Sequence, residues 1–207
     1  MAALAKLLRP EANKAPGPSR TFGSSHVITV LLTIGEAGSI GRGALAKQAG
    51  LGDGAIRTVI KRLKEDGYVL VKPAGCTLSA KGEQAYGELK RKLPGTVRLS
   101  KTSLTLGREQ VALLVKDEAK RVRSGIEQRD ASILAGATGA TTYTIKGSRF
   151  QIPGSSQDCE KDFPSGAWSE LRRSLHPVDG DVVIVCGSDD GRKSFIAAIS
   201  SALTLLE

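Results

Sequence analysis

Long apolar runs are absent from this 207-residue sequence. The longest ones, near residues 27–34 and 111–115, are much shorter than the roughly 20 residues that a membrane-spanning helix requires. The run Ala2–Leu8 has Lys6 in its middle and lacks the sustained apolar segment of a secretory signal. We therefore expect a cytoplasmic protein that makes no membrane contact.

Cysteine and histidine are also scarce. Cys76, Cys159 and Cys186 lie far apart and lack the close pairs typical of thiolate metal sites or disulfide frameworks. His26 and His176 fall in different predicted domains, and no recognisable nucleophile motif stands beside either. The sequence also lacks the GK[ST] ending of a P-loop and the GxGxxG turn of dinucleotide-binding folds. These absences predict no metal, no cofactor and no catalytic centre, and hence a protein that is not an enzyme.

Basic charge is abundant and unevenly distributed. The formal net charge is +9. Residues 1–95 hold 15 Lys and Arg against 7 Asp and Glu, whereas residues 96–207 hold 15 against 14. A basic domain joined to a nearly neutral one suits the binding of phosphate backbones by the first half, although basic surfaces also serve solubility or acidic partners.

Proline and glycine divide the chain into an extension and two domains. Residues 1–23 are predicted to form a flexible N-terminal extension, because three prolines stand among scattered polar residues without an apolar period. Residues 24–95 contain three helical patterns, a hairpin with its tip at Pro73–Gly75, and a fourth helix that Pro94 breaks. Helix, helix, turn, helix, hairpin and helix is the order of a complete winged helix-turn-helix domain.

Capping residues place the ends of these helices. Ser24 or Ser25 is expected to cap the first helix, which Gly35 ends. Asp53 is expected to cap the third helix and Ser79 the fourth, because their oxygens can accept hydrogen bonds from free amides of the first turn.

Residues 96–207 are predicted to form an α+β domain. Strands are expected at residues 110–115, 141–145, 149–152 and 181–186, and helices at 118–135 with a break at Gly125, at 165–175 and at 191–206. The resulting order βαββαβ plus a terminal helix predicts a ferredoxin-like sandwich that serves as an effector-sensing or dimerisation domain.

The third helix carries the strongest indication of function. Ile56, Val59, Ile60 and Leu63 form its apolar stripe, and the opposite face is polar and mainly basic. The N-terminal part of this helix in a helix-turn-helix enters the major groove of DNA. The residues predicted to contact bases are Asp53, Gly54, Arg57, Thr58 and Lys61, and those predicted to contact the backbone or the flanking groove are Arg42, Arg62, Lys64 and Lys72.

A family resemblance supports this interpretation. The segment LAKQAGLGDGAIRTVIKRLKEDG, together with the later LSAKG, resembles winged-helix regulators of archaea and bacteria. With GIEQRDASILAGATGATTYTIKG and GDVVIVCGSDDGRKSFIAAISSALTLL added, the chain resembles archaeal two-domain proteins in which a winged helix precedes a domain of unknown function. The resemblance implies transcriptional regulation and supplies no ligand.

The segment IEQRDASILAGATGATTY is the candidate ligand site of the second domain. Two adjacent charges and several small residues there can bring backbone amides close to a bound anion or carboxylate. The candidate residues are Arg129, Asp130, Gly136, Thr138, Gly139 and Thr141. The alternative interpretation is a helix C-cap and a tight turn, in which the charge pair is structural.

We therefore expect a transcriptional regulator that binds double-stranded DNA as a homodimer and is controlled by a small-molecule effector or by dimerisation through its second domain. Three alternatives remain open at this point. The second domain can be an enzyme fused to a winged helix, the protein can contact the transcription machinery instead of an operator, or the winged helix can be a protein-interaction module.

Overall fold

The chain folds into two compact units, unit 1 (Met1–Leu89) and unit 2 (Lys90–Glu207). The computed structural model describes residues 22–206, so the predicted extension lies almost entirely outside the described residues. The division between the units falls at residues 89 and 90, whereas the sequence placed the domain boundary at residues 95 and 96. Within residues 22–206, no helix has the length and apolar character needed to cross a membrane.

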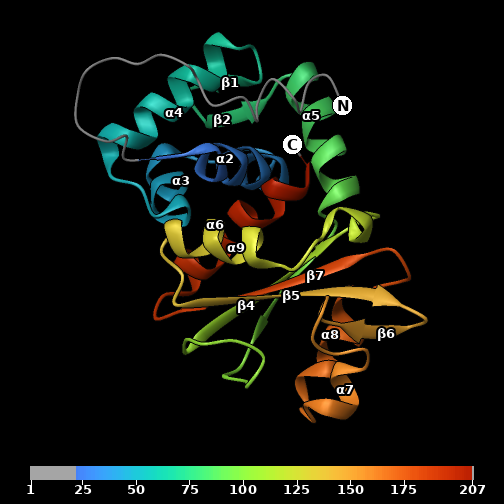
Figure 1. Cartoon of the computed structure of the whole chain (residues 1–207). Helices are drawn as coiled ribbons and strands as arrows, with labels where there is room; N and C mark the ends of the chain where they lie inside the picture. The colour runs from blue at the N-terminus through green and yellow to red at the C-terminus, as the bar shows by residue number, and fades with distance from the viewer. Residues whose placement is uncertain (1–21, 207) are drawn as a thin grey trace. The chain divides into compact units, whose positions relative to one another are not determined.

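Unit 1 consists of three helices, a hairpin and a fourth helix, in the order that the sequence predicted (Figure 1). The elements are α2 (Ser24–Ala37), α3 (Arg42–Ala49), α4 (Asp53–Glu65), β1 (Val69–Lys72), β2 (Gly75–Leu78) and α5 (Ala80–Lys92), the last of which continues into unit 2. The predicted apolar stripe of α4 is confirmed, because Ile56, Val59, Ile60 and Leu63 are all buried.

Two of the predicted helix caps were wrong and one is confirmed. Gly23 stands at the cap position of α2 and Gly52 at that of α4, and neither helix has a side-chain cap from the predicted serines or Asp53. Asp53 is instead the first residue of α4, and its carboxylate pairs with two arginines. The Ser79 hydroxyl does cap α5 and accepts a hydrogen bond from the Gly82 amide at 3.0 Å.

The prediction that Gly35 ends the first helix was also wrong, because α2 continues to Ala37. Glycine is needed there for packing: a Cβ added at Gly35 would overlap the ring of Tyr86, which lies on α5. The absence of a side chain therefore lets the two helices approach closely, at the usual cost of a glycine inside a helix.

Unit 2 is an α+β unit around a five-stranded antiparallel sheet with the strand order β3-β4-β7-β5-β6. Its strands are β3 (Thr96–Leu99), β4 (Glu109–Val115), β5 (Gly139–Lys146), β6 (Arg149–Gln151) and β7 (Val182–Ser188). Its helices are α6 (Ile126–Leu134), α7 (Cys159–Asp162), α8 (Ala167–Leu175) and α9 (Gly191–Leu206), with a 3-10 turn at Ala119–Arg121. The predicted break at Gly125 is confirmed, since this residue precedes α6 in a left-handed conformation (φ 80°).

The ferredoxin-like prediction was wrong in three respects: the strand order, the number of strands and the faces that helices cover. β7 lies between β4 and β5, and an additional strand, β3, extends the sheet beyond β4. Helices also cover both faces: α6 and α9 pack on one face, and α8 packs on the other (Figure 1). The cause lies in the central strand, because all seven residues of β7 are buried and a strand that is apolar on both sides requires cover on both sides.

The α8 face of the sheet has an aromatic centre. The rings of Tyr143 and Trp168 meet edge to face at a centroid distance of 5.2 Å, and Phe150 packs against both. Leu171 of α8 is fully buried in the same cluster.

Replacing Leu171 with alanine is expected to lower the free energy of unfolding by about 2–5 kcal/mol, because the change leaves a cavity in a close-packed core. Leu134→Ala is the matched control, since Leu134 is 90% exposed and its truncation should change stability by no more than about 0.5 kcal/mol. Chemical denaturation monitored by tryptophan fluorescence measures both. Equal effects of the two substitutions on stability would contradict the placement of Leu171 in the core of unit 2.

Candidate functional site

Five cations of unit 1 line one hollow of about 510 Å³. We call this hollow the basic groove and define it by Arg42, Arg57, Lys61, Lys64 and Lys72. Three of the residues lie on α4, one begins α3 and one ends β1. All five were among the predicted DNA-contacting residues, and the fold brings them together from three elements.

Asp53 lies between two arginines of the groove. Its carboxylate pairs with Arg57 at 2.5 Å, one helical turn away, and with Arg42 at 3.2 Å. All three side chains are more than half exposed, so these pairs are solvent-screened and contribute only about 0–1 kcal/mol each. They orient the guanidinium groups without holding them strongly.

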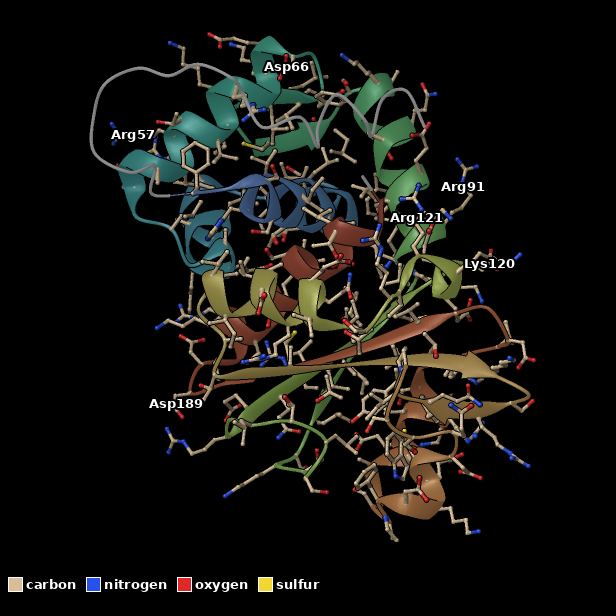
Figure 2. The ribbon with its side chains drawn as sticks, viewed as in Figure 1. Arg57, Asp66, Arg91, Lys120, Arg121 and Asp189 are labelled. Atoms are coloured by element: carbon tan, nitrogen blue, oxygen red, sulfur yellow. The ribbon has the colours of Figure 1, made fainter. Side chains whose placement is uncertain are left out.

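The other predicted contact residues do not all reach the groove. Arg62 lies on a different side of α4, where it is largely covered and pairs with Asp66 at 3.9 Å. Figure 2 shows Arg57 projecting near the beginning of α4, at the opposite end of the helix from Asp66. Gly54 and Thr58 are exposed, but the Thr58 hydroxyl donates a hydrogen bond to the Gly54 carbonyl oxygen at 3.0 Å.

The hairpin is tied to the segment before α3. Ile40 and Cys76 exchange backbone hydrogen bonds of 3.1 and 2.8 Å, and the Ser39 hydroxyl donates to the Ala74 carbonyl oxygen at 3.3 Å. Gly75 makes this approach possible: its φ is +132°, and an added Cβ would come within 2.8 Å of the Ile40 backbone. The tether places Lys72 beside the cations of α3 and α4.

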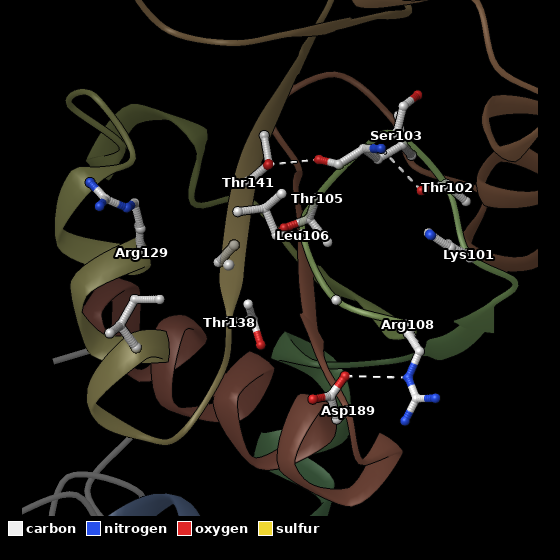
Figure 3. A pocket seen from close by; sticks show the side chains of 15 residues that line it. Lys101, Thr102, Ser103, Thr105, Leu106, Arg108, Arg129, Thr138, Thr141 and Asp189 are labelled. Carbon is white, nitrogen blue, oxygen red and sulfur yellow. Dashed lines mark hydrogen bonds and ion pairs between the residues drawn. The ribbon is translucent and has the colours of Figure 1, made fainter.

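A second hollow, of about 780 Å³, lies entirely within unit 2. We call it the β5 cleft. Its walls are the loop 101–108, the α6 residues Arg129 and Ile133, the segment Thr138–Thr141 at the beginning of β5, and Asp189. Figure 3 shows Arg129 on α6 at one side of β5 and the loop at the other.

Buried Gln110 fixes the loop of the β5 cleft. Its amide nitrogen donates to the carbonyl oxygens of Thr102, Thr105 and Gly107 at 2.9–3.1 Å, and its amide oxygen accepts from the Thr102 hydroxyl at 2.5 Å. The hydroxyl of Thr141 adds a bond to the Leu104 carbonyl oxygen at 2.7 Å.

Two paired glycines of the sheet make room for the same loop. Gly139 of β5 lies opposite Gly187 of β7. A Cβ added at Gly187 would overlap the Leu106 carbonyl oxygen, and one added at Gly139 would lie 3.0 Å from the Leu106 Cβ. The loop therefore sits directly on the sheet because both positions lack a side chain.

Only some residues of the predicted ligand segment lie together in the structure. Arg129, Thr138, Gly139 and Thr141 line the β5 cleft, whereas Asp130 and Gly136 do not. Sequence reasoning did not identify the loop 101–108 or Asp189 as walls of the cleft; Asp189 pairs with Arg108 at 3.4 Å (Figure 3). The sequence feature that could have indicated this loop is the run KTSLTLGR, which contains threonines and basic residues and lies between two strands.

The three cysteine thiols are buried and protonated. Cys76, Cys159 and Cys186 are all buried, and burial raises the pKa of each thiol, that of Cys186 to about 12. A thiol with a raised pKa stays protonated and is a weak nucleophile. Among residues 22–206, no group of three or more His, Cys, Asp or Glu side chains has an arrangement that suits a metal ion.

Replacing Gln110 with alanine is expected to release the loop 101–108, because three carbonyl oxygens lose their common donor. The amides of this loop should exchange with deuterium faster, and the free energy of unfolding should fall by about 1–3 kcal/mol. Glu109→Ala is the control, since this neighbouring side chain is exposed. Unchanged exchange in the loop of the Gln110 variant would show that something else holds it.

Comparisons with known proteins give a family match for the second half of the chain and a structural match for most of the chain. Residues 106–205 match a family described as a domain of unknown function, DUF4443. No curated protein matches the chain.

A solved structure, the hypothetical protein PH0730 from Pyrococcus horikoshii OT3, is similar to 89% of this chain and 92% of its own, with a TM-score of 0.73 and 23% sequence identity. Likeness at this identity establishes a shared fold and leaves activity open. The DUF4443 match covers most walls of the β5 cleft, and the fold as a whole is shared with an archaeal protein.

Proposed function

We propose that unit 1 is a winged helix-turn-helix domain that binds double-stranded DNA, and that the chain is a transcriptional regulator. The basic groove is the observation that carries this proposal: five cations from α3, α4 and β1 line a single hollow. In this interpretation α3 and α4 are the helix-turn-helix, and the hairpin of β1 and β2 is the wing.

The clustering of cations in the groove supports DNA binding more strongly than the net charge of unit 1 does. Residues 22–89 carry eight Lys and Arg against six Asp and Glu, so the described part of unit 1 is only slightly basic. Five of these eight cations lie in the groove. Such concentration on one face supports a specific anionic partner more strongly than a general excess of lysine does.

In this proposal, four of the five cations have distinct tasks. α4 enters the major groove with its exposed basic face, on which Arg57 and Lys61, one helical turn apart, reach base edges. Arg42 at the beginning of α3 and Lys72 beside the hairpin turn contact phosphates on either side. DNA replaces the exposed partner of Arg57, Asp53, at little cost because that ion pair is weak.

Unit 2 is proposed to control this binding through a ligand in the β5 cleft. The cleft offers threonine hydroxyls, backbone groups and cations, and the thiols of the chain are buried with raised pKa values. These groups favour binding over catalysis. Because one recognition helix reads only a few base pairs, we also propose that the chain binds DNA as a homodimer.

Arg57→Ala combined with Lys61→Ala is expected to abolish sequence-selective DNA binding and to leave the fold intact, because both side chains are exposed. The slope of log affinity against log salt should change little, because the proposed phosphate contacts of Arg42 and Lys72 remain. Fluorescence anisotropy with duplexes selected by the full chain, over a series of salt concentrations, measures both quantities.

Lys120→Ala combined with Arg123→Ala is the charge-matched control, since it removes two exposed cations from unit 2. It should leave DNA affinity within about twofold of the unmodified chain. If the double variant retains full affinity, α4 is not the recognition helix.

The homodimer proposal predicts a bound site with two half-sites whose centres lie about 34–36 Å apart, one turn of DNA, or a multiple of that distance. Footprinting of the selected duplexes and sedimentation of the complex measure spacing and stoichiometry. A single protected half-site with one chain bound would refute the dimer and leave DNA binding by unit 1 in place.

A further inference from the structure

The beginning of β5 is an unpaired sheet edge inside the β5 cleft. β5 pairs with β7 over Gly139–Thr144, but β6 covers only Thr144–Lys146 on the other side. Over residues 139–143, the outer side of β5 therefore has no strand partner within residues 22–206, and residues 139–141 of this stretch line the cleft. Alternate residues of an antiparallel strand direct their N–H and C=O groups to that side, which makes the edge a template for one more short strand.

Apolar side chains flank this edge above and below the plane of the sheet. Ile133 of α6 is 41% exposed on one side of the cleft, and Leu106 of the loop is 68% exposed on the other. Successive side chains of a strand point to opposite faces, so a strand added here places alternate side chains against Ile133 and against Leu106. The cleft therefore has both parts of a strand-addition site, a free backbone edge and two flanking apolar contacts.

The charges of the cleft select the partner. Lys101, Arg108 and Arg129 line it together with a single carboxylate, that of Asp189, which is already paired with Arg108. Figure 3 shows Lys101 and Arg129 on opposite sides of β5, so cations flank the edge from both walls. Acidic side chains on an added strand complement these cations.

We propose that the β5 cleft binds an extended acidic peptide segment of a partner protein, which adds as a short antiparallel or parallel strand to residues 139–143 of β5.

The charge of the cleft and the requirements of strand pairing disfavour two other occupants. Residues 1–21 of this chain contain four Lys and Arg, one Glu and three prolines, which suits neither the charge of the cleft nor strand pairing. A second copy that paired its own β5 edge would bring the same cations together.

This inference rests on the proposal that the β5 cleft is a binding site, and it is independent of DNA binding by unit 1. Peptide binding is measured on the full chain without DNA. The Arg57→Ala, Lys61→Ala variant of unit 1 should bind the peptide as the unmodified chain does, so failure of the peptide proposal and failure of the DNA proposal are distinguishable.

The test is selection of peptides from a display library of random seven-residue segments against the full chain. The selected sequences are expected to alternate β-branched residues with Asp or Glu and to lack proline at the centre. Against the Lys101→Glu, Arg129→Glu variant, the selected sequences should carry Lys or Arg in place of the acidic residues.

Two measurements on one selected peptide complete the test. Arg129→Glu should weaken its binding at least tenfold, whereas Arg129→Lys and the control Arg123→Glu, an exposed cation outside the cleft, should retain it within about threefold. Hydrogen exchange should show that the peptide protects alternate amides of residues 139–143.

Each of the following results would overturn the proposal. These results are a selection that enriches no peptide, selection of the same sequences by the charge-reversed variant, and protection that falls outside residues 139–143. Displacement of the peptide by free glutamate or succinate at equal concentration would identify the cleft as a small-anion site. Protection of residues 139–143 in a peptide-free dimer would identify a second copy as the occupant.

Discussion

The exchange of two backbone hydrogen bonds between Ile40 and Cys76 sets the geometry of the candidate DNA-binding surface. These bonds fasten the hairpin to the segment that leads into α3, and Gly75 permits the approach because a side chain there would strike the Ile40 backbone. As a consequence Lys72 of the hairpin lies in the same hollow as Arg42 and Arg57 of the helices. The basic groove is thus a product of tertiary structure, since its residues are separated in the sequence by up to thirty positions.

A different constraint shapes unit 2. β7 is buried along its whole length, which requires helices on both faces of the sheet and leaves the free edge of the sheet as the place where backbone groups remain accessible. Gln110 then holds the loop 101–108 against the paired glycines Gly139 and Gly187, beside that edge. A rigid loop next to a free strand edge is a suitable arrangement for binding, because neither wall has to be ordered when the ligand arrives.

The sequence predicted well what depends on local periodicity and poorly what depends on distant contacts. The stripe and basic face of α4 follow from helical geometry alone, and Arg129 with the beginning of β5 was found because these residues are close in sequence. The ferredoxin-like topology failed although the unbroken apolar run 182–186 indicated cover on both faces. The loop 101–108 was missed because hydrogen bonds from Gln110, rather than any local motif, give it its shape.

Binding of α4 in the major groove of DNA is the central claim, and methylation interference tests it most directly. Duplexes selected by the full chain are methylated at guanine N7, which lies in the major groove, and the bound and free fractions are compared. The account predicts that methylation at defined guanines prevents binding by the unmodified chain and that the positions opposite Arg57 lose this effect in Arg57→Ala at low salt. Failure of the full chain to select any duplex, or binding that is indifferent to N7 methylation at every position, would contradict it.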